Sequence, residues 1–273
     1  MEYEIRPKEK LNLGIAELWQ YRELFYFFTW RDIKVKYKQT VLGFLWAILQ
    51  PLIMTMLFSF SLGKIISNNT QLNMPYPLFA LSGLIVWNIF SSGLSGAGNS
   101  MVTNSNIIKK IYFPRLIIPI SAVLVSLFDF IMAFIIFIGM LIYYQTDIHI
   151  LNFIIFFPLS ILITCISTFG LGCWLAALNI KYRDFRYIIP FMIQGLLFLT
   201  PVIYPLSLIS NLKIKYLLAL NPMYSAVELS RYAVTTKPLD SNLMLVSVLS
   251  AILFFIIGVF YFRKTEAYFA DLA

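Results

Sequence analysis

Residues 41–66 read VLGFLWAILQPLIMTMLFSFSLGKII, and Lys64 is the only charged residue among them. About 20 apolar residues in a helix cross the hydrocarbon core of a bilayer, so this stretch is long enough to span a membrane. It is preceded by eight basic residues, Arg6, Lys8, Lys10, Arg22, Arg31, Lys34, Lys36 and Lys38. Because segments rich in Lys and Arg stay in the cytoplasm, the N-terminus is predicted to be cytoplasmic.

The composition is that of an integral membrane protein. Of the 273 residues, 60% are hydrophobic and 12% are charged, whereas soluble proteins average about 25% charged residues. The net charge of +8 comes from basic residues beside apolar stretches, where anionic headgroups and topology account for it, so no nucleic-acid binding is expected. The first apolar stretch begins too late and runs too long for a cleavable signal peptide, and we expect it to be kept as an anchor.

Five further apolar stretches bring the prediction to six membrane spans. They are expected at about 41–66, 76–97, 116–143, 150–178, 188–206 and 243–262. Sixteen of the 21 Lys and Arg residues then fall on the side of the N-terminus, which predicts that both termini are cytoplasmic. The fold class is all-α, with a cytoplasmic tail and interface helix, a transmembrane domain and a second cytoplasmic tail at 1–40, 41–265 and 263–273.

The segment before the first span predicts an amphipathic helix over residues 12–33 that lies in the membrane interface. Its wide apolar face carries Ile15, Leu18, Trp19, Phe25, Tyr26, Trp30 and Ile33. Leu24 and Phe28 interrupt the polar face. The alternative is a helix packed against the bundle.

The segment between the last two spans is broken by prolines. Asn221 is a good N-cap and Pro222 suits the first helical position, so a short helix is predicted over Met223–Val234. That helix is too short to span a membrane. We expect 206–236 to form a pair of short re-entrant helices in the outer leaflet, against the alternative of an ordinary extracellular loop.

The sequence argues against an enzyme. It contains no GxxxxGK[ST] loop, so ATP, if used, must be hydrolysed by another subunit. His149 is the single histidine, and no cluster of carboxylates accompanies it. Asp129, in the middle of the third span, is either a proton relay or a polar tie to Ser or Asn neighbours, and we favour the tie.

Two short cytoplasmic segments, 104–115 and 179–187, mix basic and aromatic residues. Apolar anchors with charges around them suit docking to a soluble partner. Contact with lipid headgroups is the alternative.

Residues 31–46, RDIKVKYKQTVLGFLW, resemble the entrance motif of type-2 ABC exporter permeases in their polysaccharide-exporting branch. Further similarity lies in IIKKIYFPR at 107–115, YRD at 182–184, TPVIYP at 200–205 and LNP at 220–222. The match covers nearly the whole chain and keeps the order of the motifs.

The resemblance implies a permease in the cytoplasmic (inner) membrane, built as a homodimer with two ATPase subunits that bind ATP and Mg. This chain would then carry no cofactor. The cargo implied is an undecaprenyl-type lipid-linked polysaccharide that passes between the two copies, surrounded by membrane lipids. The extended N-terminus and the Gln39-Thr40 variant favour lipopolysaccharide O-antigen export, while teichoic acid and capsular polysaccharide remain alternatives.

The resemblance also implies roles for individual residues. Coupling to the ATPase would involve Arg31, Asp32, Asn106, Lys109, Lys110, Tyr112, Phe113, Arg115, Arg183 and Asp184. The substrate would enter beside Leu42, Gly43 and Trp46. The outer gate would involve Pro201, Tyr204, Pro205, Asn221, Pro222, Glu228 and Arg231.

Two other classes stay in view. An ion-coupled secondary carrier is disfavoured because Asp129 is the one clear charge within a span. A membrane glycosyltransferase is disfavoured because the chain lacks a catalytic cluster.

Overall fold

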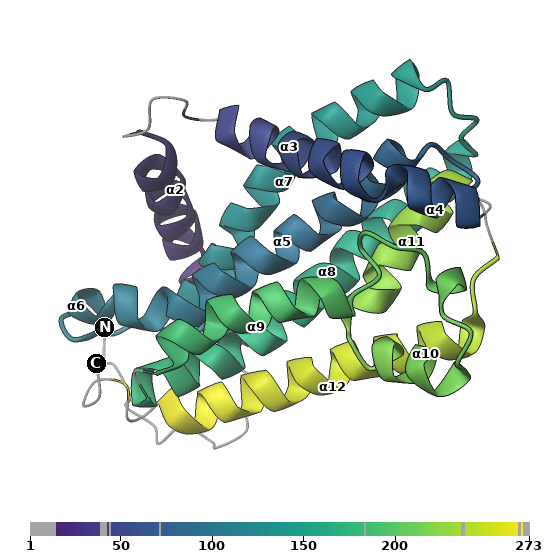
Figure 1. The fold of residues 1–273 in the computed structure, drawn as a ribbon. Helices are drawn as coiled ribbons and strands as arrows, with labels where there is room; N and C mark the ends of the chain where they lie inside the picture. Colours follow the sequence, from purple (N-terminus) through teal and green to yellow (C-terminus); the bar gives the residue numbers. More distant parts are fainter. Residues whose placement is uncertain are drawn as a thin grey trace.

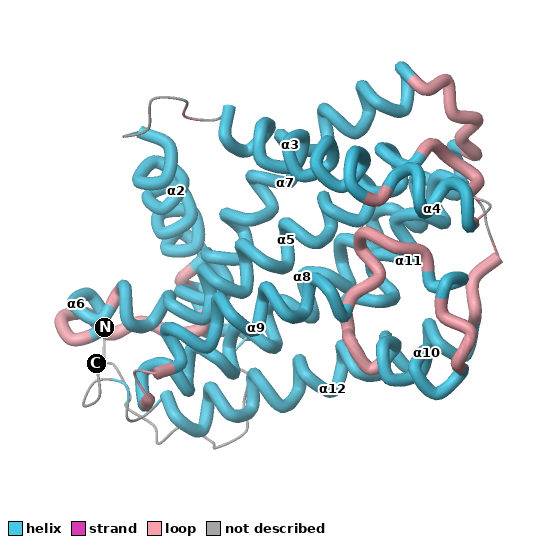
Figure 2. Tube along the Cα trace, viewed as in Figure 1, coloured by secondary structure: helices cyan, strands magenta, loops and turns pink. Residues whose placement is uncertain are grey.

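The computed structural model describes residues 15–38, 43, 45–70, 72–182, 184–235, 238–266 and 269. Within these residues the regular structure is entirely helical (Figures 1 and 2). The helices are α1 (Ile15–Gln20), α2 (Arg22–Lys38), α3 (Leu45–Ser61), α4 (Gly63–Asn69), α5 (Tyr76–Thr103), α6 (Ser105–Ile108), α7 (Ile117–Tyr143), α8 (Ile150–Lys181), α9 (Phe185–Leu199), the 3₁₀ turn η1 (Leu206–Leu208), α10 (Leu212–Ala219), α11 (Met223–Thr235) and α12 (Ser241–Thr265).

Four of these helices, α5, α7, α8 and α12, are long and apolar enough to cross a membrane. Two shorter apolar helices, α3 and α9, have 17 and 15 residues. Each of the six predicted apolar stretches therefore contains a helix. The chain is a polytopic, all-helical membrane protein, and the count of six spans stays a prediction.

The largest differences between the helices and the predicted stretches lie at three places. The first stretch is divided at Leu62 into α3 and α4, and the second continues past 97 to Thr103. The fifth ends at Leu199 because Thr200 is extended, with φ −93° and ψ 136°. A residue before proline disfavours helical geometry, and Pro201 imposes that restriction here.

The long helices form one bundle with α5 at its centre (Figure 1). Leu81, Ile85, Phe90 and Leu94 of α5 are fully buried, as expected for a helix that is apolar on nearly all sides. The segments at α6, between α8 and α9, and at the end of α12 gather at one end of the bundle, which we call the α6 end. α4, α10 and the start of α11 lie at the opposite end, the α10 end.

α2 lies across the direction of the long helices and packs on α7 (Figure 1). Its buried side chains are Phe28, Ile33 and Tyr37. Ile33 belongs to the predicted apolar face, whereas the prediction that Phe28 lies on the polar face is wrong. The exposed apolar residues of α1 and α2 are Trp19, Tyr26, Phe27, Trp30 and Val35. Both sides of this segment are rich in apolar residues, and periodicity alone could not tell the face that packs on protein from the face left outside.

α8 and α12 approach most closely at Gly170 and Gly258. An ideal Cβ on Gly258 would lie 2.7 Å from the carbonyl carbon of Gly170, and one on Gly170 would lie 2.7 Å from the backbone nitrogen of Phe255. Small residues let membrane helices pack backbone against backbone. Since the obstacles are backbone atoms, no side-chain rotation can make room.

We expect Gly258→Ala to destabilise the protein by about 1–3 kcal/mol through overpacking, measured as the melting temperature of the purified chain in detergent. Gly139→Ala is the matched control, because nothing lies within 4 Å of its ideal Cβ. That change should leave stability equal or slightly raised, since alanine is the better helix former. Equal melting temperatures for the two variants would contradict the close crossing.

Candidate functional site

A polar groove runs along α5 where α2 and α7 face it. It comprises two adjoining cavities of about 430 and 110 Å³ whose linings share Lys36, Ser92, Ser126 and Asp129. We call the two together the α5 groove. α5 contributes a row of small polar residues at helical spacing, Asn88, Ser91, Ser92, Ser95, Gly96, Asn99, Ser100 and Thr103.

Several hydroxyls of this row donate to carbonyls of their own helix. Ser92 Oγ donates to the carbonyl of Asn88 at 2.6 Å, and Thr103 Oγ1 donates to that of Asn99 at 3.0 Å. A hydroxyl that donates keeps its oxygen lone pairs as acceptors. These hydroxyls therefore present acceptors to a group that enters the groove.

Asp129 of α7 lies where the two cavities meet. Its carboxylate accepts hydrogen bonds from Lys36 Nζ and Tyr37 Oη of α2. The expectation of Ser or Asn partners is wrong, because the partners come from a helix 93 and 92 residues away. Burial, followed by the hydrogen bond to Asp129, raises the pKa of Tyr37, so its phenol stays protonated and donates.

Arg31 joins α2 to the α6 end of the bundle. Its Nη2 donates to Asn104 Oδ1 at 2.7 Å, and its Nε and Nη2 donate to Asp32 Oδ1 at 2.8 and 2.7 Å. Its guanidinium also lies over the ring of Phe28, 4.9 Å from the centroid. Asn104 sits between α5 and α6, so α2 is fixed to the start of the segment predicted to dock a partner.

That segment divides into an exposed part and a buried part. Asn106, Lys109, Lys110 and Tyr112 are exposed. Phe113 is buried and packs on Phe28 of α2 with ring centroids 5.5 Å apart. The exposed residues lie at the surface of the α6 end, while the buried one holds the segment on the bundle.

Arg115 links the same segment to the end of α12. Its Nη1 donates to the carbonyl of Glu266, and its backbone nitrogen donates to Glu266 Oε1 at 3.2 Å. Arg263 Nη1 donates to Glu266 Oε2 at 2.9 Å. Three segments distant in sequence, ending at Lys38, Arg115 and Glu266, are therefore tied together at the α6 end.

The residues predicted at the substrate entrance lie at the start of α3. Gly43 has φ +48°, a conformation that glycine adopts without strain. Trp46 is half-exposed and lines the smaller cavity of the α5 groove. Leu42 lies outside the described residues.

The residues predicted at the outer gate gather at the α10 end around the turn at 200–205, which we call the outer turn. Tyr76 Oη donates to the carbonyl of Ile203 at 2.9 Å, and Tyr204 Oη donates to that of Phe198 at 3.0 Å. Asn221 Nδ2 donates to Thr200 Oγ1 at 2.6 Å. Pro201, Pro205 and Pro222 are buried.

Asn221 also serves as the cap that the sequence predicts, because its Oδ1 accepts from the backbone nitrogen of Met223 at 3.0 Å. Its carbonyl accepts from Ser247 Oγ of α12 at 2.9 Å. A single residue thus holds together the end of α9, the start of α11 and α12.

Arg231 of α11 is the most deeply buried charge in this region, with 4% of its surface exposed. Its Nη2 donates to the carbonyl of Val202 at 2.6 Å, and its Nη1 donates to Glu228 Oε1 at 3.1 Å. The guanidinium lies 3.6 Å from the centroid of Phe79. Gly83 leaves the room, since an ideal Cβ there would lie 2.9 Å from the Val202 oxygen and 3.1 Å from Arg231 Nη2.

Residues 23–235 match the family model described as ABC-2 type transporter. The chain belongs to this family. The match runs from α2 to the end of α11, so it includes the α5 groove, the outer turn and, at the α6 end, α6 and the segment between α8 and α9.

Relatives of this ABC-2 chain carry names from polysaccharide export. It is 32% identical over 218 residues to the O-antigen export system permease protein RfbA of Myxococcus xanthus, covering 77% of this chain and 80% of the relative. It is 28% identical over 266 residues to RfbA of Klebsiella pneumoniae, covering 97% and 98%. It is 27% identical over 209 residues to the polysialic acid transport protein KpsM of Escherichia coli, covering 75% and 78%.

Sequence reasoning missed several residues of this ABC-2 chain. Asn104 and Glu266 gave no local signal, because their importance comes from partners far away in the chain. The row on α5 did give one, since Asn88, Ser92, Ser95 and Asn99 recur every three or four residues. Asp184 lies exposed beside the start of α9, and Arg183 lies outside the described residues.

We expect Asp129→Asn to loosen α2 from α7, because an amide can still accept from Tyr37 but cannot pair with the charge of Lys36. A charge-assisted hydrogen bond contributes about 1.5–3 kcal/mol, so hydrogen exchange in α2 should rise roughly tenfold or more. The measurement is exchange mass spectrometry on the full chain.

The matched control is Asp147→Asn, because Asp147 is an exposed carboxylate before α8. Exchange in α8 should stay unchanged in both variants. Unchanged exchange in α2 of Asp129→Asn would show that the pair does not hold the helix in place.

Proposed function

We propose that this chain is the permease subunit of an ATP-driven ABC exporter that moves a lipid-linked polysaccharide of the O-antigen type across the cytoplasmic membrane. The observation that carries the proposal is the α5 groove, whose row of hydroxyl and amide groups suits a polyhydroxylated chain. The hydroxyls that donate to their own helix still offer oxygen lone pairs to a polar chain that passes along the groove. The names of the relatives support the same cargo.

The proposed topology has six spans and both termini in the cytoplasm. It is supported by the gathering of the basic segments at one end of the bundle (Figure 1), as expected where Lys and Arg stay on the cytoplasmic side. The α6 end is then cytoplasmic and the α10 end is the outer side. In this arrangement α10 and α11 are re-entrant elements between the fifth and sixth spans.

ATP and Mg would be bound by two separate ATPase subunits that dock on the α6 end. Lys109, Lys110 and Tyr112 would contact them, together with Arg183 and Asp184 of the second segment. Movement of the first segment would be passed to α2 through Arg31 and Asn104, and to α12 through Arg115 and Glu266. ATP can shift the conformational equilibrium of the permease only if the ATP-bound ATPase binds one conformation of the permease more tightly than another.

A second copy of the chain would complete the conduit for the undecaprenyl-type carrier and its glycan. α3 and α9 expose large apolar residues, among them Phe60, Phe191 and Phe198. These faces suit either lipid or the partner copy. Gly43 and Trp46, at the start of α3, would then lie at the cytoplasmic entrance with Leu42.

Capsular polysaccharide is a second candidate cargo, which the similarity to KpsM favours. Teichoic acid stays a further alternative within the same kind of exporter. All three share the physical requirement of a hydroxyl-rich polymer crossing an apolar bundle, so the α5 groove does not choose among them.

The test is to delete the gene in its own host and measure glycan on the cell surface and in the cytoplasm, while a tagged copy is purified to identify its partners. We expect surface glycan to disappear, lipid-linked glycan to accumulate inside, and an ATPase subunit to co-purify stoichiometrically. Unchanged surface glycan, with no ATPase bound, would refute the proposal.

Lys109→Glu should lower export at least tenfold while the chain still accumulates in the membrane. The reason is that placing like charges across a docking surface disfavours association by several kcal/mol. Export is measured as surface glycan per cell, and ATPase binding by co-purification. Lys213→Glu is the control, since Lys213 is equally exposed on α10 at the opposite end; equal export by both variants would remove Lys109 from the docking surface.

A further inference from the structure

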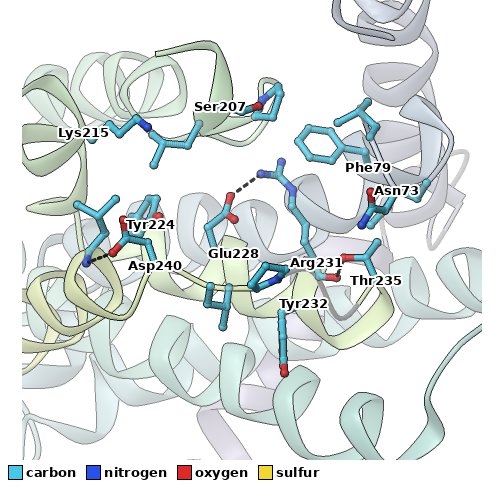
Figure 3. A pocket seen from close by; sticks show the side chains of 17 residues that line it. Asn73, Phe79, Ser207, Lys215, Tyr224, Glu228, Arg231, Tyr232, Thr235 and Asp240 are labelled. Atoms are coloured by element: carbon cyan, nitrogen blue, oxygen red, sulfur yellow. Dashed lines mark hydrogen bonds and ion pairs between the residues drawn. The ribbon is translucent and has the colours of Figure 1, made fainter. Parts of the chain in front are cut away.

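A cavity of about 170 Å³, here named the outer cavity, lies at the α10 end between α11 and the segment that joins the outer turn to α10. Figure 3 shows Glu228 and Arg231 near its middle, Lys215 and Asp240 toward one side, and Asn73 and Phe79 toward the other. The α5 groove does not include any of these residues. The outer cavity is therefore a separate place in the fold.

The charges on the described lining of this cavity balance. Lys215 and Arg231 are positive, while Glu228 and Asp240 are negative. A small anion or cation gains little from a site with no net charge. A neutral ligand with several hydroxyl groups gains more, because each hydroxyl both donates and accepts and hydrogen bonds to charged groups are the stronger ones.

The acceptor at the middle of the cavity is held in place before any ligand arrives. Arg231 is fixed by Phe79 and by the carbonyl of Val202, and in turn it donates to Oε1 of Glu228. The Glu228 side chain keeps 22% of its surface exposed, against 5% for Arg231. Glu228 can thus meet a ligand with little loss of side-chain freedom, which is the main gain from preorganisation.

The size of the cavity sets the size of the ligand. Since water occupies about 30 Å³ per molecule in the liquid, the outer cavity has room for roughly six waters. A single pyranose ring displaces a similar volume. The apolar side chains of Leu206 and Leu243 in the lining would pack against the C–H faces of such a ring, as in ligand sites that combine apolar walls with a few polar groups.

We infer that the outer cavity is a subsite for one neutral sugar residue of the glycan, on the side where the glycan leaves the bundle. This inference rests on the proposed function and adds to it a defined contact between cargo and gate. Glu228 and Asp240 accept from ring hydroxyls, and Lys215 donates to one. A sugar in the subsite would contact Glu228 of α11. The same helix holds the outer turn in place through Arg231.

The test uses the full chain with its co-purified ATPase in nanodiscs and saturation-transfer difference NMR. The probes are the methyl glycosides of glucose, galactose, mannose and N-acetylglucosamine, with inorganic phosphate as the anionic probe. We expect at least one glycoside to bind in the millimolar range. Lys215→Met should raise its Kd about fivefold or more, and Lys213→Met, two residues earlier on the same helix but outside the lining, should not change it.

A second variant tests the subsite by blocking the cavity, so that the test does not depend on the loss of a single hydrogen bond. Ser207→Trp places a large ring at the exposed rim of the cavity and should abolish glycoside binding while the chain still folds. Binding that is weakened by Lys215→Met, abolished by Ser207→Trp and unchanged in Lys213→Met supports the subsite. No glycoside binding to the unaltered chain, binding indifferent to both variants, or saturable phosphate binding in place of glycosides would overturn it.

These outcomes are separate from those of the proposed function. Glycoside binding that follows this pattern supports the subsite even if deletion of the gene leaves surface glycan intact, a result that would refute the exporter alone. Glycan export without any glycoside binding would overturn the subsite and leave the exporter standing.

Discussion

Inside a bilayer, each backbone group that a helix leaves free must find a partner within the protein, and this constraint organises the α10 end. The outer turn frees the carbonyls of Val202 and Ile203 next to buried prolines. Arg231 and Tyr76 supply the donors. The positions of α5, α9 and α11 are fixed together as a consequence, because a donor from one helix has to reach the backbone that another helix leaves free.

Arg231 brings a further requirement, since a buried guanidinium needs its own compensation. Glu228 supplies a charge and Phe79 supplies a ring face. Gly83 is required for the same reason, as a larger residue would fill the space that the guanidinium occupies. Four features thus depend on one another. They are the outer turn, the buried cation of Arg231, the anion of Glu228 one turn away, and the glycine at position 83 on the neighbouring helix.

The distance along the chain between interacting residues decides which parts of the structure can be predicted from the sequence. The apolar stretches predict the long helices, because hydrophobicity and length act locally. The cap at Asn221 is predictable for the same reason, since the side chain and the helix it starts are neighbours in the chain. The partners of Asp129, Arg31 and Arg115 are not predictable in this way, because each lies more than 70 residues away. Phe28 shows a third case, in which two apolar sides of one helix leave the buried side undetermined.

The hydrogen bonds that Asp129 accepts are relevant to how the proposed exporter would work. Its carboxylate is engaged by an ammonium group and a phenol that both donate to it. Both donors come from α2, the helix that lines the α5 groove. Under the proposed function, the pair therefore acts by holding α2 over the groove. Because Arg31 connects α2 to the segment that would meet the ATPase, the groove and the proposed energy source would act on the same helix.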